Sequence, residues 1–218
     1  ALRYDIVENN PAAGVRKIAG KARTRRLSAA EIRALGEAME IAERNEENPT
    51  GLAAVRALLL TGYRISEIIG MERSWLHADR GYVHFPDTKT DGQVRPIGQA
   101  AIRLLKALPE KRGLSLFFPS DFVDRPYSGV PETLRALCAI AGIKGVTPHV
   151  LRHTFGSVAG DMGFSELTIK ALLGHGARGS TQNYVHIDEA LRLAVERVSM
   201  KIANLLDGRE STILRLAA

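Results

Sequence analysis

The hydrophobic positions of this chain recur mostly at the spacing of one helix face. In the clearest case Ile32, Leu35 and Met39 are three or four residues apart, and they follow a capping box formed by Ser28 and Glu31. An Asn-Pro-Thr-Gly run separates this helix from the next, strongly apolar one. Similar patterns predict helices over residues 28–45, 52–60, 63–71, 99–108, 131–141, 148–161, 166–173 and 188–206.

Strand character is confined to one region of the chain. Short segments at 75–77, 81–87 and 93–98 carry aromatic and β-branched residues, and the runs between them, Ala-Asp-Arg-Gly and Lys-Thr-Asp-Gly-Gln, are typical of turns. This pattern predicts a small three-stranded antiparallel sheet. The expected fold class is therefore mainly α (α+β).

Composition narrows the class of protein. The length of 218 residues and the hydrophobic content of 45% fit either one large domain or one domain with a short leader. No apolar run approaches the roughly 20 residues of a membrane span, and the start shows no signal-peptide pattern. The only cysteine, Cys138, excludes an intrachain disulfide and is expected to be buried, and Trp75 is expected in the core. We expect a cytoplasmic protein without a membrane partner.

The net charge of +6, taken alone, is compatible with binding to nucleic acid, to an anionic membrane or to an acidic protein. An acidic helix face that begins at Glu31 indicates that the surface is not basic all round. A flexible basic leader precedes it, and such a leader suits an arm that contacts a phosphate backbone. The alternative is a linker that its charge merely keeps in solution. The basic residues of the leader are Arg16, Lys17, Lys21, Arg23, Arg25 and Arg26.

The predicted helix that starts near Thr147 offers a candidate anion site. Thr147 is a good N-cap and Pro148 suits the first helical position, so His149 and Arg152 lie on one face of the first turns. Backbone N–H groups and the helix dipole favour a phosphate there. The alternative is that Arg152 forms a surface salt bridge and His149 is incidental.

The same helix also raises the question of a metal site. His149 and His153 are four residues apart, as in zinc-binding helices. No glutamate follows His149 and no cysteine or carboxylate nearby offers a third ligand, so His175 or His186 would have to be recruited. We therefore expect no metal.

Two further segments carry candidate chemistry. Arg64 and Glu67 are three residues apart, so the carboxylate can orient a guanidinium that grips two phosphate oxygens. The alternative is an exposed ion pair worth about 0–1 kcal/mol. Lys89 lies in or beside a tight turn between two predicted strands, where it is either simply exposed or placed to give a proton to a substrate.

A single tyrosine stands behind a polar loop. Tyr184 follows His175 by nine residues, in the segment LLGHGARGSTQNYV. Either Tyr184 packs against the rest of the protein or its hydroxyl is a nucleophile. The segment alone does not decide between these two interpretations.

Taken in their order and spacing, TGYRISEI, TKTDGQVRPI, HVLRHTF and LLGH with its following tyrosine resemble the catalytic domain of the tyrosine recombinase (phage integrase) family. The resemblance runs from about Ser28 to the helix after Tyr184. It implies the helical tyrosine-recombinase fold with its small sheet. The roles that it implies are a nucleophile, Tyr184; two phosphate clamps, Arg64 and Arg152; a general acid, Lys89; two further active-site positions, His149 and His175; and an acidic orienting position, Glu67.

The function implied by this resemblance is site-specific recombination or integration through a covalent 3′-phosphotyrosyl intermediate. That intermediate retains the energy of the broken bond, so neither ATP nor a metal is required and no cofactor is expected. The implied partner is double-stranded DNA. The protein is expected to be a homotetramer on DNA and a monomer or weak oligomer without it. DNA-bending accessory proteins are possible further partners.

The resemblance also divides the chain. Residues 1–27 are expected to be a basic leader from an absent N-terminal DNA-binding domain, and residues 28–207 the catalytic domain. Residues 208–218 form a tail that is apolar enough, with Ile213, Leu214 and Leu216, to suggest docking on a neighbouring protomer.

Two other functions stay open from sequence alone. One is DNA relaxation in the manner of a type IB topoisomerase, which uses the same chemistry without strand exchange. The other is a DNA-binding regulator without catalysis, in which residues 164–185 form a helix-turn-helix. The complete set of arginine, lysine, histidine and tyrosine positions argues against the regulator.

Overall fold

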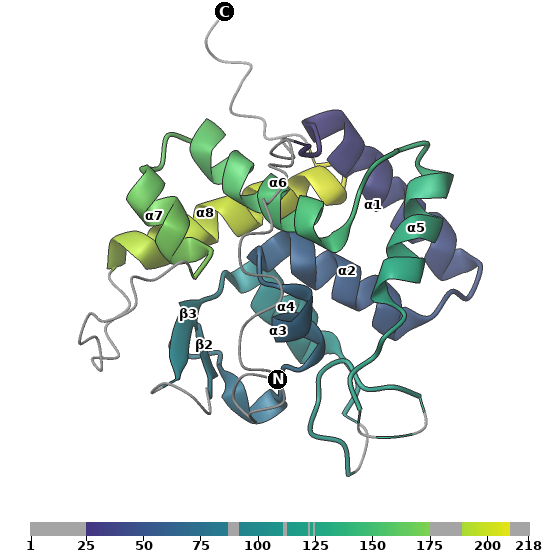
Figure 1. Ribbon diagram of the computed structural model, residues 1–218, viewed down its shortest axis with the longest axis horizontal. Coiled ribbons are helices and arrows are strands. Elements are labelled where there is room, and N and C mark those ends of the chain that lie inside the picture. The colour runs from purple at the N-terminus through teal and green to yellow at the C-terminus, as the bar shows by residue number, and fades with distance from the viewer. Residues whose placement is uncertain are drawn as a thin grey trace, which may run out of the picture.

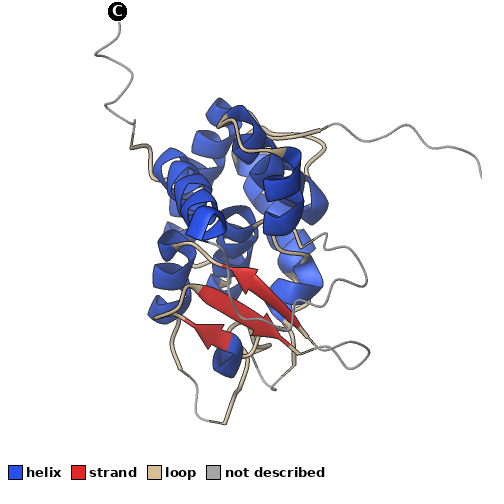
Figure 2. Ribbon diagram, turned by 90° about the vertical axis from the view of Figure 1, so that its left-hand side faces the viewer, coloured by secondary structure: helices blue, strands red, loops and turns tan. Residues whose placement is uncertain are grey.

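A computed structural model of the chain describes residues 25–86, 92–110, 113–121, 123, 125–174 and 189–209. Helices make up most of the body, and a small sheet lies at one end of it (Figures 1 and 2). In the described part of the chain, the helices are α1 (Ala29–Arg44), α2 (Pro49–Thr61), α3 (Ile65–Ile69), the 3-10 helix η2 (Arg73–Trp75), α4 (Gln99–Ala107), α5 (Val130–Ile140), α6 (Pro148–Asp161), α7 (Glu166–Leu172) and α8 (Glu189–Leu206).

The predicted capping box at the start of α1 is confirmed. The backbone N–H of Glu31 donates to Ser28 Oγ at 3.2 Å, and the backbone N–H of Ser28 donates to Glu31 Oε2 at 2.8 Å. The predicted start of α2 was too late. Asn48 caps this helix by accepting a hydrogen bond from the N–H of Gly51 at 3.1 Å, so Pro49 is already helical, at a position where its missing N–H costs nothing.

Helix α2 is the centre of the fold. It packs against α1, α4, α5, α6 and α8, and Figure 1 shows it between α5 and α6. Its buried residues, which run from Gly51 to Thr61, lie on all sides of the helix rather than along one stripe. A helix that is apolar all round is stable only when other elements enclose it. This central position fixes the end of α2, which leads directly into Arg64.

The three-stranded antiparallel sheet is confirmed, with strand order β1-β2-β3. Strands β1 (Leu76–His77), β2 (Tyr82–Phe85) and β3 (Gln93–Pro96) are shorter than the predicted segments. In the register of β2 and β3, Val83 stands opposite Arg95. Phe85 makes an edge-on contact with Tyr63, with ring centroids 5.5 Å apart, and this contact joins the sheet to the segment after α2.

Two side-chain predictions have different outcomes. Cys138 is buried in the core, as expected. Trp75 is only partly buried: it packs against the edge of the core and makes an edge-on contact with Phe85. No helix in the described ranges is both long enough and apolar enough to cross a membrane.

Candidate active site

The turn after α2 places Arg64 at the start of α3. Gly62 ends α2 in a left-handed conformation, Tyr63 is fully buried, and Arg64 is the N-cap residue of α3. Glu67 accepts two hydrogen bonds from Arg64: its Oε1 lies 2.6 Å from Arg64 Nη1, and its Oε2 accepts the Arg64 backbone N–H at 2.7 Å. The side chain of Arg64 is 46% exposed, whereas that of Glu67 is 16% exposed. Glu67 is thus the anchored member of the predicted pair, and Arg64 is the member that reaches solvent.

The second candidate segment begins α6, where the helix start is confirmed. Thr147 accepts a hydrogen bond from the N–H of Val150 at 3.4 Å, and Pro148 is the first helical residue. His149 is exposed, and its ring lies edge-on to that of His153 with centroids 4.4 Å apart. Among the described residues no group of three histidine, cysteine, aspartate or glutamate side chains is placed to hold a metal ion. His175 and His186, which a metal site would have to recruit, lie outside the described residues.

Arg152, one turn further along α6, is not the surface residue that one alternative supposed. It is 4% exposed, and its guanidinium donates to the carbonyl oxygen of Gly62 at 2.8 Å and to that of Leu173 at 2.5 Å. One side chain thus connects the end of α2, the start of α6 and the end of α7. This connection brings the Arg64 turn and α6 into one site.

A third arginine, Arg95 on β3, belongs to the same cluster and was not predicted as a site residue. Its side chain is 1% exposed, and its Nη1 lies 3.4 Å from Glu67 Oε2. The available signal was the hairpin register, because Arg95 stands directly opposite Val83, which is fully buried. Residues that face each other across two strands point to the same side of the sheet, so this pairing with an apolar residue was a hint that Arg95 is buried as well.

The electrostatics of the cluster are dominated by positive charge. Burial, together with the positive charges of Arg64 and Arg95, lowers the pKa of Arg152 to about 10, and the negative charge of Glu67 opposes this shift. At neutral pH Arg152 therefore still carries its proton. Burial by itself raises the pKa of Glu67, but Arg95 and the hydrogen bonds from Arg64 outweigh it, so the net pKa lies below its usual range. The site thus holds one ionised carboxylate among three guanidinium groups, an arrangement suited to an anion.

Several predicted site residues lie outside the described residues. Lys89 belongs to the connection between β2 and β3, and His175 and Tyr184 belong to the connection between α7 and α8. Gly174, the last described residue of that connection, lies against the Arg95 guanidinium, so His175 follows directly from the cluster in the chain.

The leader is described only at its end. Arg25 pairs with Glu31 at 2.5 Å and Arg26 pairs with Asp161 at 2.7 Å. Both charges therefore already have acidic partners within the protein. The other basic residues of the leader, Arg16, Lys17, Lys21 and Arg23, lie outside the described residues.

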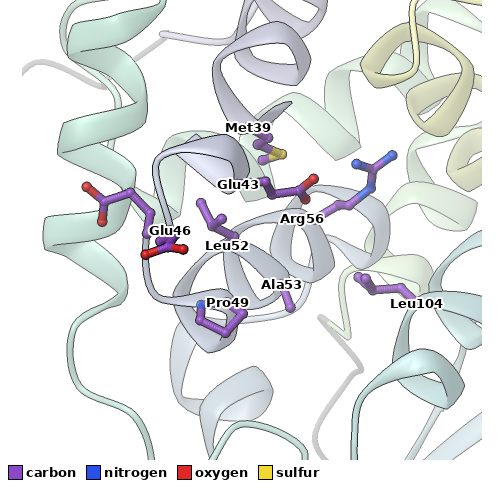
Figure 3. A pocket seen from close by; sticks show the side chains of 9 residues that line it. Met39, Glu43, Glu46, Pro49, Leu52, Ala53, Arg56 and Leu104 are labelled. Carbon is purple, nitrogen blue, oxygen red and sulfur yellow. The ribbon is translucent and has the colours of Figure 1, made fainter. Parts of the chain in front are cut away.

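A pocket of about 450 Å³ lies elsewhere, where α1 turns into α2, with Leu104 of α4 at one side (Figure 3). Met39 and Leu52 contribute to its apolar lining, and among its described lining residues three carboxylates outnumber one basic residue: Glu43, Glu46 and Glu47 against Arg56. Carboxylates repel a phosphate, so this pocket does not suit a DNA backbone. Of the two places, the arginine cluster is the one that fits an anionic substrate.

Comparisons with known proteins identify the family of the chain. The model of the phage integrase family matches residues 25–190 of the chain. Tyrosine recombinase XerD of Chlorobaculum tepidum is 32% identical over 148 residues, which cover 63% of this chain and 49% of that protein. Tyrosine recombinase XerC of Pelobacter propionicus is 30% identical over 153 residues, which cover 65% of this chain and 50% of that protein. The chain thus spans about half the length of the curated relatives it matches.

Solved structures show the same fold. The crystal structure of XerA recombinase has a TM-score of 0.60 and 26% identity, over 80% of this chain and 63% of that chain. A lambda integrase tetramer bound to a Holliday junction has a TM-score of 0.57 and 21% identity, over 86% of this chain and 57% of that chain. The second likeness concerns the fold alone.

Proposed function

Because the chain belongs to the phage integrase family, we propose that it is the catalytic domain of a site-specific DNA recombinase. The observation that carries this proposal is that Arg64 and Arg152 belong to one positive cluster, in which Arg152 donates to the Gly62 carbonyl and Glu67 holds Arg64. Two guanidinium groups near one point can each make paired hydrogen bonds to a phosphate. The substrate is double-stranded DNA, and the reaction takes place at one of its backbone phosphates.

The chemistry follows from the residue types. The hydroxyl oxygen of Tyr184 attacks the phosphorus atom, and the bond from phosphorus to the 5′-oxygen breaks. Lys89 gives a proton to the leaving oxygen, and His149 is the candidate that accepts the tyrosine proton. A free tyrosine, with a pKa of about 10, is ionised in only about one molecule in a thousand at pH 7, so nearby cations must favour the phenolate.

The arginines act on charge that develops during the attack. Negative charge builds on the non-bridging oxygens of the five-coordinate phosphorus, and we assign its stabilisation to Arg64 and Arg152, with His175 as a further donor. The product is a 3′-phosphotyrosyl ester on Tyr184. A 5′-hydroxyl from another strand reverses the reaction and releases the enzyme, so the reaction needs neither ATP nor a metal ion.

The assembly that we propose is a homotetramer on two DNA duplexes, in the cytoplasm. The tail at 208–218 would dock on a neighbouring protomer through its apolar residues. The test is a deletion after Asp207, with assembly on DNA followed by native gel shift. Loss of the tetramer is expected, and an unchanged assembly would remove the tail from the proposal.

A covalent-adduct assay tests the chemistry. The protein is incubated with nicked or supercoiled DNA in EDTA without ATP, denatured with detergent, and examined for protein linked to DNA. We expect an adduct that disappears in Tyr184→Phe but persists in the matched variant Tyr127→Phe, whose hydroxyl lies beside Thr133. An adduct that survives Tyr184→Phe would show that another residue is the nucleophile. A requirement for two DNA sites during strand exchange separates a recombinase from a type IB topoisomerase.

A further inference from the structure

Arg95 has a position that the proposed chemistry does not use. Its guanidinium lies over the ring of Tyr63, 4.5 Å from the centroid, and its side chain is 1% exposed. The proposed chemistry gives it no contact with DNA. Burying a charge to this extent is costly unless it is paired and hydrogen-bonded, so its partners indicate what it does.

Arg95 holds two parts of the site at once. Its Nη1 lies 3.4 Å from Glu67 Oε2, and its Nη2 donates to the carbonyl oxygen of Leu172 at 2.8 Å. The next two carbonyls are held as well: Arg152 donates to Leu173, and Gln93 Nε2 donates to Gly174 at 3.4 Å. The last carbonyls of a helix have no partner within the helix, and here three side chains from β3 and α6 supply partners.

Gly174 shows how closely Arg95 approaches this end of α7. A Cβ atom at position 174 would lie 2.3 Å from Arg95 Nη1, and the backbone there has a φ of +65°. Only glycine meets both conditions without strain. The helix end that leads into His175 is therefore built against the Arg95 guanidinium.

We propose that Arg95 is a positioning residue of this site: it keeps Glu67 in place while Arg64 turns to the substrate phosphate, and it fixes the end of α7 that precedes His175. The proposal rests on the proposed function above, in which Arg64 binds a phosphate. If Arg64 leaves Glu67, a largely buried carboxylate loses its closest charged partner, and an uncompensated buried charge is strongly unfavourable. Arg95 and the Arg64 backbone N–H remain to hold it.

Arg64 and Arg95 thus differ in exposure, and we assign them different roles for that reason. Arg64, 46% exposed, is free to change partners, whereas Arg95, 1% exposed, is not. The charged and titratable groups that act on this pair, among the described residues, are Arg64, Tyr63 beside Arg95, and Arg152 on α6. Of these, Arg95 is the cation whose charge most strongly opposes the effect of burial on Glu67.

The first test needs no DNA. The carboxyl carbon of Glu67 is followed by NMR through a pH titration in the wild-type chain and in Arg95→Met, with Glu67→Gln to assign the signal. We expect the pKa of Glu67 to rise by about one unit or more in Arg95→Met, because an opposite charge has been removed. The matched control is Arg73→Met, since Arg73 also lies over an aromatic ring, that of Phe117, and donates to a carbonyl. An unchanged Glu67 pKa in Arg95→Met overturns the proposal.

The second test measures the adduct rate with the same variants. In Arg95→Met we expect the adduct rate to fall by about tenfold to a hundredfold. We also expect the acid limb of its pH profile to shift to higher pH, whereas Arg73→Met should keep the wild-type rate and profile. Arg95→Lys restores the charge but cannot reach Glu67 and Leu172 together, so it should recover the profile and only part of the rate. A wild-type rate in Arg95→Met contradicts the positioning role. A wild-type chain that forms no Tyr184 adduct would instead contradict the proposed function, and the titration would still decide on Arg95 and Glu67.

Loss of folding in Arg95→Met would be informative too. In the double variant Arg95→Met with Glu67→Gln, the buried carboxylate is removed together with its cation. This variant should therefore regain stability that Arg95→Met alone has lost. A double variant as unstable as Arg95→Met would show that Arg95 does not serve Glu67.

Discussion

The guanidinium of Arg152 donates a hydrogen bond of 2.8 Å to the carbonyl oxygen of Gly62, a residue 90 positions earlier in the chain. A second bond, to Leu173, joins the end of α7 to the same side chain. Arg152 is therefore a structural link between three helices as well as a candidate phosphate ligand. Substitution of Arg152 should therefore affect both the stability of the fold and the adduct rate, and the replacing residue decides how strongly each is affected.

Arg152→Lys should separate these two properties. Lysine keeps the charge but has one nitrogen, so it cannot serve two carbonyls and a phosphate with a planar fork. We expect the adduct rate to fall by about a hundredfold or more and the free energy of unfolding to fall by about 1–2 kcal/mol. Arg135→Lys, at an exposed ion pair with Glu132, is the control and should change neither quantity. A wild-type adduct rate in Arg152→Lys would contradict its role as a clamp.

Gly62→Ala should destabilise the fold more than an equivalent change elsewhere. Gly62 has a φ of +64°, and a Cβ there would lie 2.6 Å from the ring of Phe155. Gly142 has a similar φ of +67° with no atom of the described structure within 4 Å of such a Cβ. We expect Gly142→Ala to cost about 1–2 kcal/mol and Gly62→Ala to cost about 3 kcal/mol or more, measured by urea unfolding. Equal losses would show that the contact with Phe155 relaxes freely.

Glu31 should make α1 sensitive to acid. Its hydrogen bond from Arg25 and the backbone N–H of Ser28 lower the pKa of Glu31 to about 2. Because the pKa is lower in the folded state, this stabilisation is complete above the unfolded-state value of about 4.3 and is lost as pH falls through about 2. Glu31→Gln keeps the capping bond but not the charge, so it should lower the free energy of unfolding by about 1 kcal/mol at pH 7.

The difference between Glu31→Gln and the wild type should therefore shrink as the pH falls from 4.5 toward 2. Urea unfolding at a series of pH values measures it. Glu37→Gln, an exposed change on the same helix, is the control for loss of one negative charge. A difference that stays constant down to pH 2 would show that the Arg25 pair contributes nothing.

The leader should contribute to DNA affinity mainly through residues before Arg25. Each phosphate contact changes the slope of log affinity against log salt by about 0.9 for duplex DNA. Glutamine at Arg16, Lys17, Lys21 and Arg23 together should therefore reduce the magnitude of that slope by about 3 to 4. Arg25→Gln should leave the slope nearly unchanged, because Arg25 is already paired with Glu31. Filter binding over a range of salt concentrations measures both, and a large effect of Arg25→Gln would show that DNA displaces Glu31.

The sequence by itself determined what depends on neighbouring residues. The capping box of α1, the Thr147–Pro148 start of α6 and the hairpin of the sheet are local, because cap and turn residues act within three or four positions of themselves. The arginine, lysine, histidine and tyrosine motifs also indicated the family, because their order and spacing are properties of the chain itself. One local feature was nevertheless not predicted: Asn48 is the N-cap of α2, but in sequence the run that contains Pro49 indicates a break between helices.

Only the tertiary structure decided which side chains meet. Arg152 and Gly62 are 90 residues apart, Arg95 and Leu172 are 77 apart, and Arg26 and Asp161 are 135 apart. No local pattern encodes such partners, since they depend on how α2, α6, α7 and the sheet pack around a shared core. Arg95 illustrates the point: in sequence it is one basic residue in a short strand, and burial beside Glu67 and Tyr63 is what makes it part of the site.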